Sequence, residues 1–254
     1  MKKLLIFSTL LYVSLACGGK AEGTSTANGS PKEALAAAVE EVVSSSGNGD
    51  CILSYQRKID ELLTLDLAKK HYTGDLSKAE VKYRKSAPER KADTDKCGYE
   101  WPSDRVRTMN FGGNTMKIPM SNEIAVQWIG SDLFMMDKKK SALENFKRFY
   151  RNASKEEKEK AFTIAEKVVQ NKEGISKETA KAATGIAKGM ASDDIIFEYV
   201  AGIGNAAAWR IKDNYLTVLV GDITFQVIAD VDKDNKVNLE LAKKIAADIL
   251  AKCK

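Results

Sequence analysis

The chain has 254 residues, of which 44% are hydrophobic and 30% are charged, which is the composition of an ordinary globular protein. Its formal net charge is +5, but lysines and glutamates are mixed along helical stretches, a pattern typical of a solvated surface and not of a nucleic-acid-binding stripe. The single histidine, His71, excludes sites that need two histidines, such as an HExxH zinc site. Its place near the end of a predicted helix favours a helix-dipole role over catalysis.

The N-terminus, MKKLLIFSTLLYVSLAC, has the parts of a bacterial secretory signal. Two lysines precede a short apolar stretch over residues 4–13, which is too short to span a bilayer comfortably. The SLAC sequence resembles a lipoprotein lipobox, with Ser14 where that family prefers leucine. We therefore predict a signal peptide over residues 1–16 and acylation, with palmitate among the acyl chains, at Cys17. The alternative is an ordinary secreted protein cut near Ala16.

Residues 17–50 are rich in Gly, Ser, Thr and Ala, and they predict a flexible tether. The tether contains one short helix, which begins after a capping box at Ser30 and Glu33. The remaining residues, 51–254, are predicted to form a single domain. In the lipoproteins that the SLAC sequence resembles, a Cys-Gly start is sorted to the outer membrane, so the resemblance implies a location in the bacterial cell envelope.

The first part of the domain predicts one helix followed by three strands. The stretch YQRKIDELLTLDLAKKHYTG has apolar residues at helical spacing and a stop at Gly74. The strands are AEVKYRK, CGYEWPS and NEIAVQWIG, and the segment MNFGGNTMKIPMS before the third is interpreted as a loop with its turn at Gly-Gly.

The section over residues 141–192 predicts three helices, and a hairpin and a final helix follow it. In YLTVLVGDITFQVIAD, a Gly221-Asp222 turn fixes the register, so that Val220 faces Ile223. The same face holds Leu216, Val218, Phe225 and Val227 and is predicted to be core. The fold class is α+β: an antiparallel sheet of five or six strands with helices packed on one face, plus the helical insertion.

Three cysteines remain after Cys17, and an exported protein favours a disulfide between two of them. Cys51 opens the domain and Cys97 opens a predicted strand, so we predict a Cys51–Cys97 bridge. Cys253 lies on the core-facing stripe of the last helix. It is either a buried free thiol or the partner of Cys51 instead. The sequence contains no CxxC pair, so we do not expect these cysteines to bind a metal.

The segment ADVDKDNKVNLELAKK partly matches a calcium loop. Asp230, Asp232, Asp234 and Asn238 occupy positions 1, 3, 5 and 9 of such a loop. Position 12 is Leu241, which cannot bind a metal, and a strand replaces the preceding helix. We therefore interpret the segment as a polar linker in which Asn238 caps the last helix, with calcium binding as the weaker alternative.

Several segments together resemble small bacterial lipoproteins of unknown function. These segments are CILSYQRKIDELLTLDLAKKHYTG, CGYEW, YVAGIGNAAAWR and LAKKIAADIL, over roughly residues 51–100 and 197–252. The resemblance implies two related halves, each with strands and a helix, and it supports the Cys51–Cys97 bridge. Asn205 departs from the aspartate of that pattern. The resemblance implies no reaction.

No cofactor is predicted, because a strand and not a helix follows the Gly202 and Gly204 turn. The leading hypothesis is a non-catalytic, membrane-anchored envelope lipoprotein that binds a partner protein or a small ligand and no nucleic acid. The alternative is a small-molecule or lipid carrier with a cavity between sheet and helices. A hydrolytic enzyme with a carboxylate site is the third hypothesis. It ranks last because no motif places the acidic residues in a catalytic arrangement.

Overall fold

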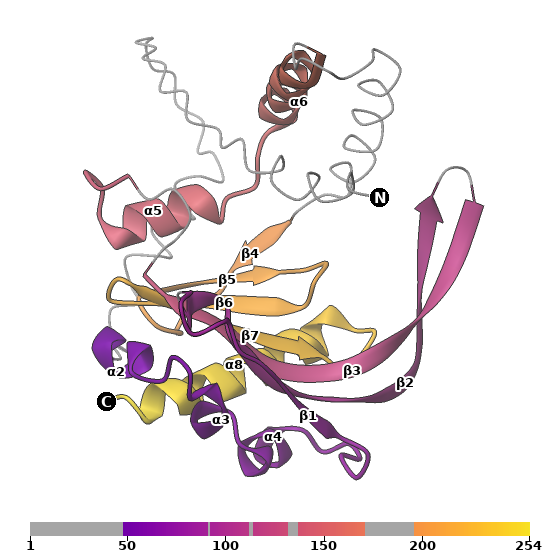
Figure 1. Ribbon diagram of the computed structural model, residues 1–254, viewed down its shortest axis with the longest axis vertical. Coiled ribbons are helices and arrows are strands. Elements are labelled where there is room, and N and C mark those ends of the chain that lie inside the picture. The colour runs from indigo at the N-terminus through magenta and orange to yellow at the C-terminus, as the bar shows by residue number, and fades with distance from the viewer. Residues whose placement is uncertain (1–47, 91, 112–113, 132–136, 171–195) are drawn as a thin grey trace, which may run out of the picture. The chain divides into compact units, whose positions relative to one another are not determined.

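The computed structural model describes residues 48–90, 92–111, 114–131, 137–170 and 196–254 (Figure 1). The chain divides into two compact units. The larger unit contains the described residues before 152 and after 195, and the smaller unit contains described residues 152–170. The predicted Cys17 and the short helix of the tether lie outside the described residues.

The larger unit is built on one antiparallel sheet of seven strands in the order β1-β2-β3-β7-β6-β5-β4. The strands are β1 (Glu80–Arg84), β2 (Lys96–Phe111), β3 (Asn114–Gly130), β4 (Phe197–Tyr199), β5 (Ala206–Arg210), β6 (Tyr215–Val220) and β7 (Ile223–Asp230). The α+β class and the antiparallel sheet are confirmed. The predicted count of five or six is short by β4, which has three residues and therefore too little periodicity to indicate a strand.

The C-terminal hairpin has the register that its turn predicts. Val220 pairs with Ile223, and the pairs Leu216–Val227 and Val218–Phe225 follow on the same face. Gly221 has φ +63, the left-handed conformation that a two-residue hairpin turn requires. All six of these side chains are buried in the main core, as the alternation of the two strands predicts.

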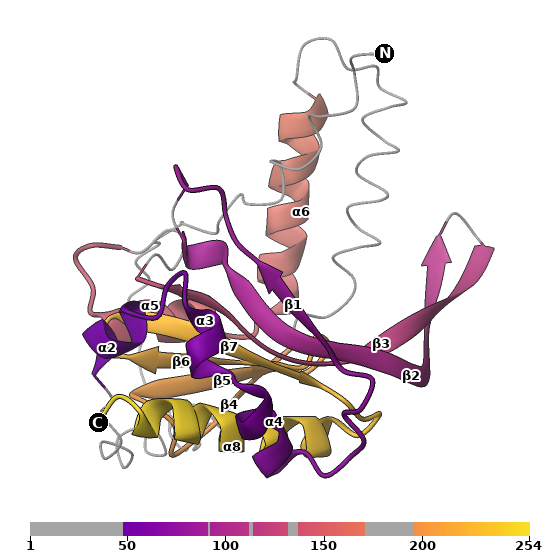
Figure 2. The ribbon, with the colours of Figure 1, turned by 60° about the horizontal axis from the view of Figure 1, so that its bottom comes forward.

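Four helices cover the face of the sheet that carries this core (Figures 1 and 2). They are α2 (Gly49–Leu53), α3 (Ile59–Leu62), α4 (Leu65–His71) and α8 (Asn235–Ala251). The single helix predicted over residues 55–74 is wrong. Leu63 is extended and Thr64 caps a new helix through its side chain, so the chain turns between α3 and α4.

The opposite face of the sheet is also covered, contrary to the prediction that helices pack on one face only. Helix α5 (Ala142–Phe149) begins with a capping box at Ser141. Phe146 and Tyr150 form a second core with Ala208 and Leu219, which alternate along their strands with residues of the main core. Burial raises the pKa of Tyr150 to about 12. Thr217 and Gln226, on the face of the hairpin opposite the main core, are consequently buried.

The smaller unit contributes one described helix, α6 (Lys155–Gln170). This helix begins with a capping box, in which Ser154 N donates to Glu157 Oε2 at 2.8 Å and Glu157 N donates to Ser154 Oγ at 3.2 Å. The predicted third helix of this section falls outside the described residues. Within the described ranges, no helix is both long enough and apolar enough to cross a membrane.

Candidate functional site

The β2–β3 hairpin continues well past the rest of the sheet (Figures 1 and 2). Strand β1 pairs only with residues 96–100 of β2, and β7 pairs with β3 only from Glu123 onward. The outer part of the hairpin, residues 106–111 and 114–119, forms rungs from Val106–Pro119 to Phe111–Asn114. We call these residues the ribbon. Among the described strands, those of the ribbon pair only with each other.

The ribbon exposes large apolar side chains. Val106 is 53% exposed, Met116 54% and Ile118 39%. Arg107 and Lys117 are its only charged residues, and residues 105–122 contain no aspartate or glutamate. An apolar, cationic element that its own domain leaves uncovered is typical of an interaction surface. The ribbon is therefore the candidate functional site.

Arg105 fixes the base of the ribbon. A register shift between Pro102 and Val106 brings its side chain inward, where the residue is only 7% exposed. Its guanidinium donates to Asn122 Oδ1 at 3.1 Å, to Ser121 O at 3.0 Å and to Asp230 O at 2.6 Å. It also forms an ion pair with the carboxylate of Asp230. The ribbon thus leaves the sheet from a base held by charge-assisted hydrogen bonds.

The acidic loop is occupied by internal hydrogen bonds. Asp230 is engaged by Arg105 and by Asn214 Nδ2, at 2.9 Å. Asp234 caps α8 by accepting from Lys236 N at 2.9 Å. Among the described residues, no group of three or more His, Cys, Asp or Glu side chains is placed to hold a metal ion.

The prediction that Asn238 caps α8 is wrong, because the helix begins earlier, at Asn235. Asn238 is buried inside the first turns and bonds back to the loop. Its Oδ1 accepts from Val231 N at 3.1 Å and from Asp232 N at 2.9 Å, and its Nδ2 donates to Asp232 O at 2.9 Å. With its amide committed to the backbone, Asn238 serves to fix the loop between β7 and α8.

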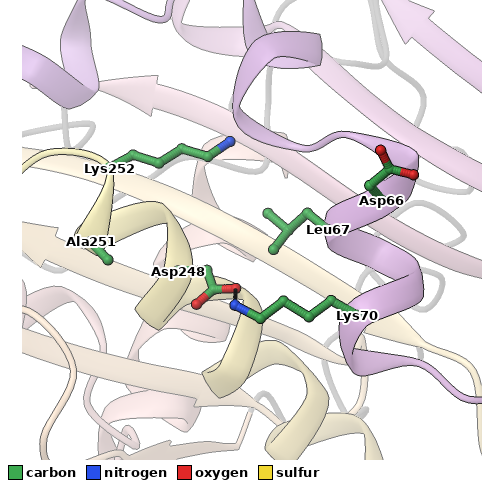
Figure 3. A pocket seen from close by; sticks show the side chains of 6 residues that line it. All are labelled: Asp66, Leu67, Lys70, Asp248, Ala251 and Lys252. Atoms are coloured by element: carbon green, nitrogen blue, oxygen red, sulfur yellow. Dashed lines mark hydrogen bonds and ion pairs between the residues drawn. The ribbon is translucent and has the colours of Figure 1, made fainter.

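A shallow hollow of about 450 Å³ lies between α4 and α8 (Figure 3). Asp248 points across it to Lys70, with Nζ and Oδ2 2.5 Å apart, and it also bonds His71 Nε2 at 2.8 Å. The Lys70 hydrogen bond, opposed by partial burial and aided by His71, lowers the pKa of Asp248. The hollow is lined by Asp66, Leu67, Lys70, Asp248, Ala251 and Lys252.

None of these six lining residues carries a hydroxyl or a thiol. Lys252 Nζ donates to the carbonyls of Glu61 and Leu62 at 3.0 and 2.9 Å, which satisfies the end of α3. The cluster thus joins α3 and α4 to α8. His71 is the last residue of α4, the position from which we predicted a helix-dipole role.

The predicted Cys51–Cys97 bridge is wrong. Cys51 bonds to Cys253, with 2.00 Å between the sulfurs and 5.6 Å between the Cα atoms, which is the alternative pairing left open by the sequence. The chain enters α2 beside the end of α8, where Asn48 N donates to Cys253 O at 3.0 Å. Cys97 is a fully buried free thiol in β2, and burial raises its pKa to about 11.

The space between the sheet and its four helices, where a carrier would need its cavity, is filled by side chains. Fully buried residues there include Leu62, Leu63, Ile124, Leu216 and Ile245. These side chains come from both layers, so the layers interlock across the interface.

The ribbon was not predicted, because the segment MNFGGNTMKIPMS indicates a loop with a Gly-Gly turn. The available signal was the Gly-Gly dipeptide with residues of strand-forming type on both sides. Arg105 carries no signal in the sequence, since its partners are 16 to 127 residues away.

No family model, curated protein or solved structure matches this chain, so the resemblance to small lipoproteins stays a prediction.

Proposed function

We propose that the protein is a non-catalytic lipoprotein of the bacterial cell envelope that is anchored through Cys17 and binds another envelope component through the ribbon. The observation that carries this proposal is the exposure of Val106, Met116 and Ile118 on an element that its own sheet leaves uncovered. The signal-like N-terminus and the lipobox-like SLAC sequence support the anchor.

The ribbon supports binding better than the other features support catalysis or transport. Its base is pre-ordered by Arg105, so little conformational entropy is lost when a partner binds. The side chains around the hollow at Asp248 join α3 and α4 to α8, and the interior between the sheet and its helices is filled by side chains. Turnover in a broad hydrolase screen, or a ligand extracted from the purified protein, would favour the enzyme or carrier alternatives instead.

Two measurements test the proposal. The anchor is tested by labelling cells with palmitate: we expect label on the mature protein and none on Cys17→Ala. The surface is tested by replacing Met116 with a photoreactive amino acid in the full-length protein and irradiating cells. Val237, which is 47% exposed on α8, is the matched control position.

We expect covalent adducts, with protein or with lipid, from position 116 and not from position 237. Equal adduct yields at the two positions would contradict a role for the ribbon. Label that persists on Cys17→Ala would contradict the anchor, whatever the ribbon contacts.

A further inference from the structure

The chemistry of the ribbon also indicates what it contacts. We propose that its target is the surface of an anionic lipid bilayer, which the outer rungs of the ribbon enter to the depth of the headgroups. This inference rests on the proposed function, since it names the component that the same surface binds.

The exposed apolar residues lie on both faces of the ribbon. Residues opposite each other in an antiparallel pair share a face, and successive rungs alternate between faces. Val106 pairs with Pro119, whereas Ile118 pairs with Arg107 on the next rung, so Val106 and Ile118 lie on opposite faces. A ribbon that docked one face on a protein would leave the other apolar face in water. The headgroup layer of a bilayer, by contrast, surrounds an element that enters it and contacts both of its faces.

The ribbon carries positive charge on both faces. Arg107 and Lys117 occupy adjacent rungs, Arg107–Ile118 and Thr108–Lys117, and therefore one cation lies on each face at nearly the same height. No acidic residue accompanies them between residues 105 and 122. Two cations at one level match a plane of lipid phosphates, to which lysine and arginine near an anionic surface are attracted.

The ribbon continues for several residues beyond the two cations. The outermost described rung, Phe111–Asn114, lies three rungs past Thr108–Lys117. At about 3.4 Å per residue this is roughly 10 Å, close to the depth of about 5–10 Å that interfacial amphipathic elements reach. Deeper entry is unfavourable, because the unpaired strand edges need water or phosphate as hydrogen-bond partners.

Photocrosslinking in vesicles of defined composition tests this inference. The full-length protein is purified and reconstituted into vesicles of phosphatidylcholine alone or with three parts in ten of phosphatidylglycerol. A photoreactive amino acid replaces Thr115 in one preparation and Met116 in another, since these residues lie beyond the cations on opposite faces, with Val237 as the control position. We expect lipid adducts from both ribbon positions, only in the anionic vesicles, and none from position 237.

The charge is tested with the double variant Arg107→Gln/Lys117→Gln in the anionic vesicles. We expect its adduct yield to fall by roughly fivefold for each charge removed. The matched control is Lys233→Gln/Lys244→Gln, which removes the same charge from exposed residues on the loop before α8 and on α8 itself. An unchanged urea midpoint for each variant shows that the fold is retained.

Each other outcome overturns the inference. Equal adducts in neutral and anionic vesicles overturn the requirement for anionic lipid, and adducts from one face only overturn entry into the headgroups. If position 116 yields no lipid adducts in vesicles but protein adducts in cells, the target is a protein and the proposed function survives. If it yields neither, both proposals fail.

Discussion

Arg105 and Asp230 are bonded through both side chain and main chain, which joins the base of the ribbon to the end of a central strand. The residues are 125 positions apart, and both side chains are largely buried, with exposures of 7% and 19%. Removing the guanidinium leaves the Asp230 carboxylate buried without its cation, and it frees the main-chain carbonyls of Ser121 and Asp230.

We therefore expect Arg105→Ala to lower the free energy of unfolding by about 3 kcal/mol. Urea unfolding followed by circular dichroism measures the change. Arg107→Ala is the control, since it removes the neighbouring arginine from the exposed ribbon and should change stability by less than about 0.5 kcal/mol. Equal effects of the two substitutions would contradict the structural role of Arg105.

The acidic loop should stabilise the protein through a helix cap and not through calcium. Asp234→Ala removes the side-chain acceptor from the start of α8, and we expect a loss of about 1 kcal/mol. Lys233→Ala, an exposed neighbour in the same loop, should be nearly neutral. Thermal unfolding with and without millimolar calcium should give the same midpoint. A midpoint that rises with calcium, and does so no longer in Asp232→Ala, would reinstate the metal site.

The Cys51–Cys253 disulfide should be the bridge found by non-reducing peptide mapping. It closes a loop of 202 residues, so its loss should destabilise the protein by about 5 kcal/mol in the chain-entropy model. The test compares the double variant Cys51→Ser/Cys253→Ser with Cys97→Ser by chemical unfolding in the absence and in the presence of a reductant. Only the double variant should become insensitive to added reductant. Recovery of a Cys51–Cys97 peptide from native protein would show that the pairing is wrong.

The buried thiol of Cys97 should make the protein less stable at alkaline pH. In the unfolded chain the thiol ionises near its ordinary pKa of 9, whereas burial raises the pKa in the folded protein to about 11. The unfolded state therefore binds fewer protons in this window, and the stability present below pH 9 is lost as the pH rises toward 11. The full shift of two pKa units corresponds to roughly 3 kcal/mol at about 1.4 kcal/mol per unit, and about 2 kcal/mol of it should be lost by pH 10.5.

Urea unfolding at pH 8.0 and at pH 10.5 measures this loss, and Cys97→Ala should reduce it. Because burial also raises the pKa of Tyr150, part of the alkaline loss should remain in that variant. An identical pH profile in wild type and Cys97→Ala would exclude the thiol as a cause. A thiol reagent should, in addition, modify Cys97 only after unfolding, since the side chain is fully buried.

Local patterns predicted the parts of the fold that local forces determine. The Gly221-Asp222 turn predicted the register of the β6–β7 hairpin, and the spacing of Leu241, Ile245 and Ile249 predicted the buried stripe of α8. The predicted turn residues Gly202 and Gly204 have φ of +81 and +62, which suits glycine. Each of these features depends on neighbours within a few positions in the sequence.

Contacts between distant segments were not predictable in this way. The pairing of Cys51 with Cys253 depends on how the start of the domain meets the end of α8, about 200 residues later. The packing of α5 on the second face depends on Ala208 and Leu219, whose small or apolar side chains suit an exposed edge equally well. The ribbon was interpreted as a loop because Val106, Met116 and Ile118 are exposed and mark no buried face with the alternation of a strand.

The Cys51–Cys253 bond also has a mechanical consequence. It joins the third residue of α2 to the residue before the C-terminal lysine, and therefore a pull between the two ends of the chain runs through one sulfur–sulfur bond. The loop from 52 to 252, with the whole sheet, bears none of that tension. A pull between its two ends consequently does not unfold the domain, and only a force applied to the sheet or the ribbon itself would load the fold.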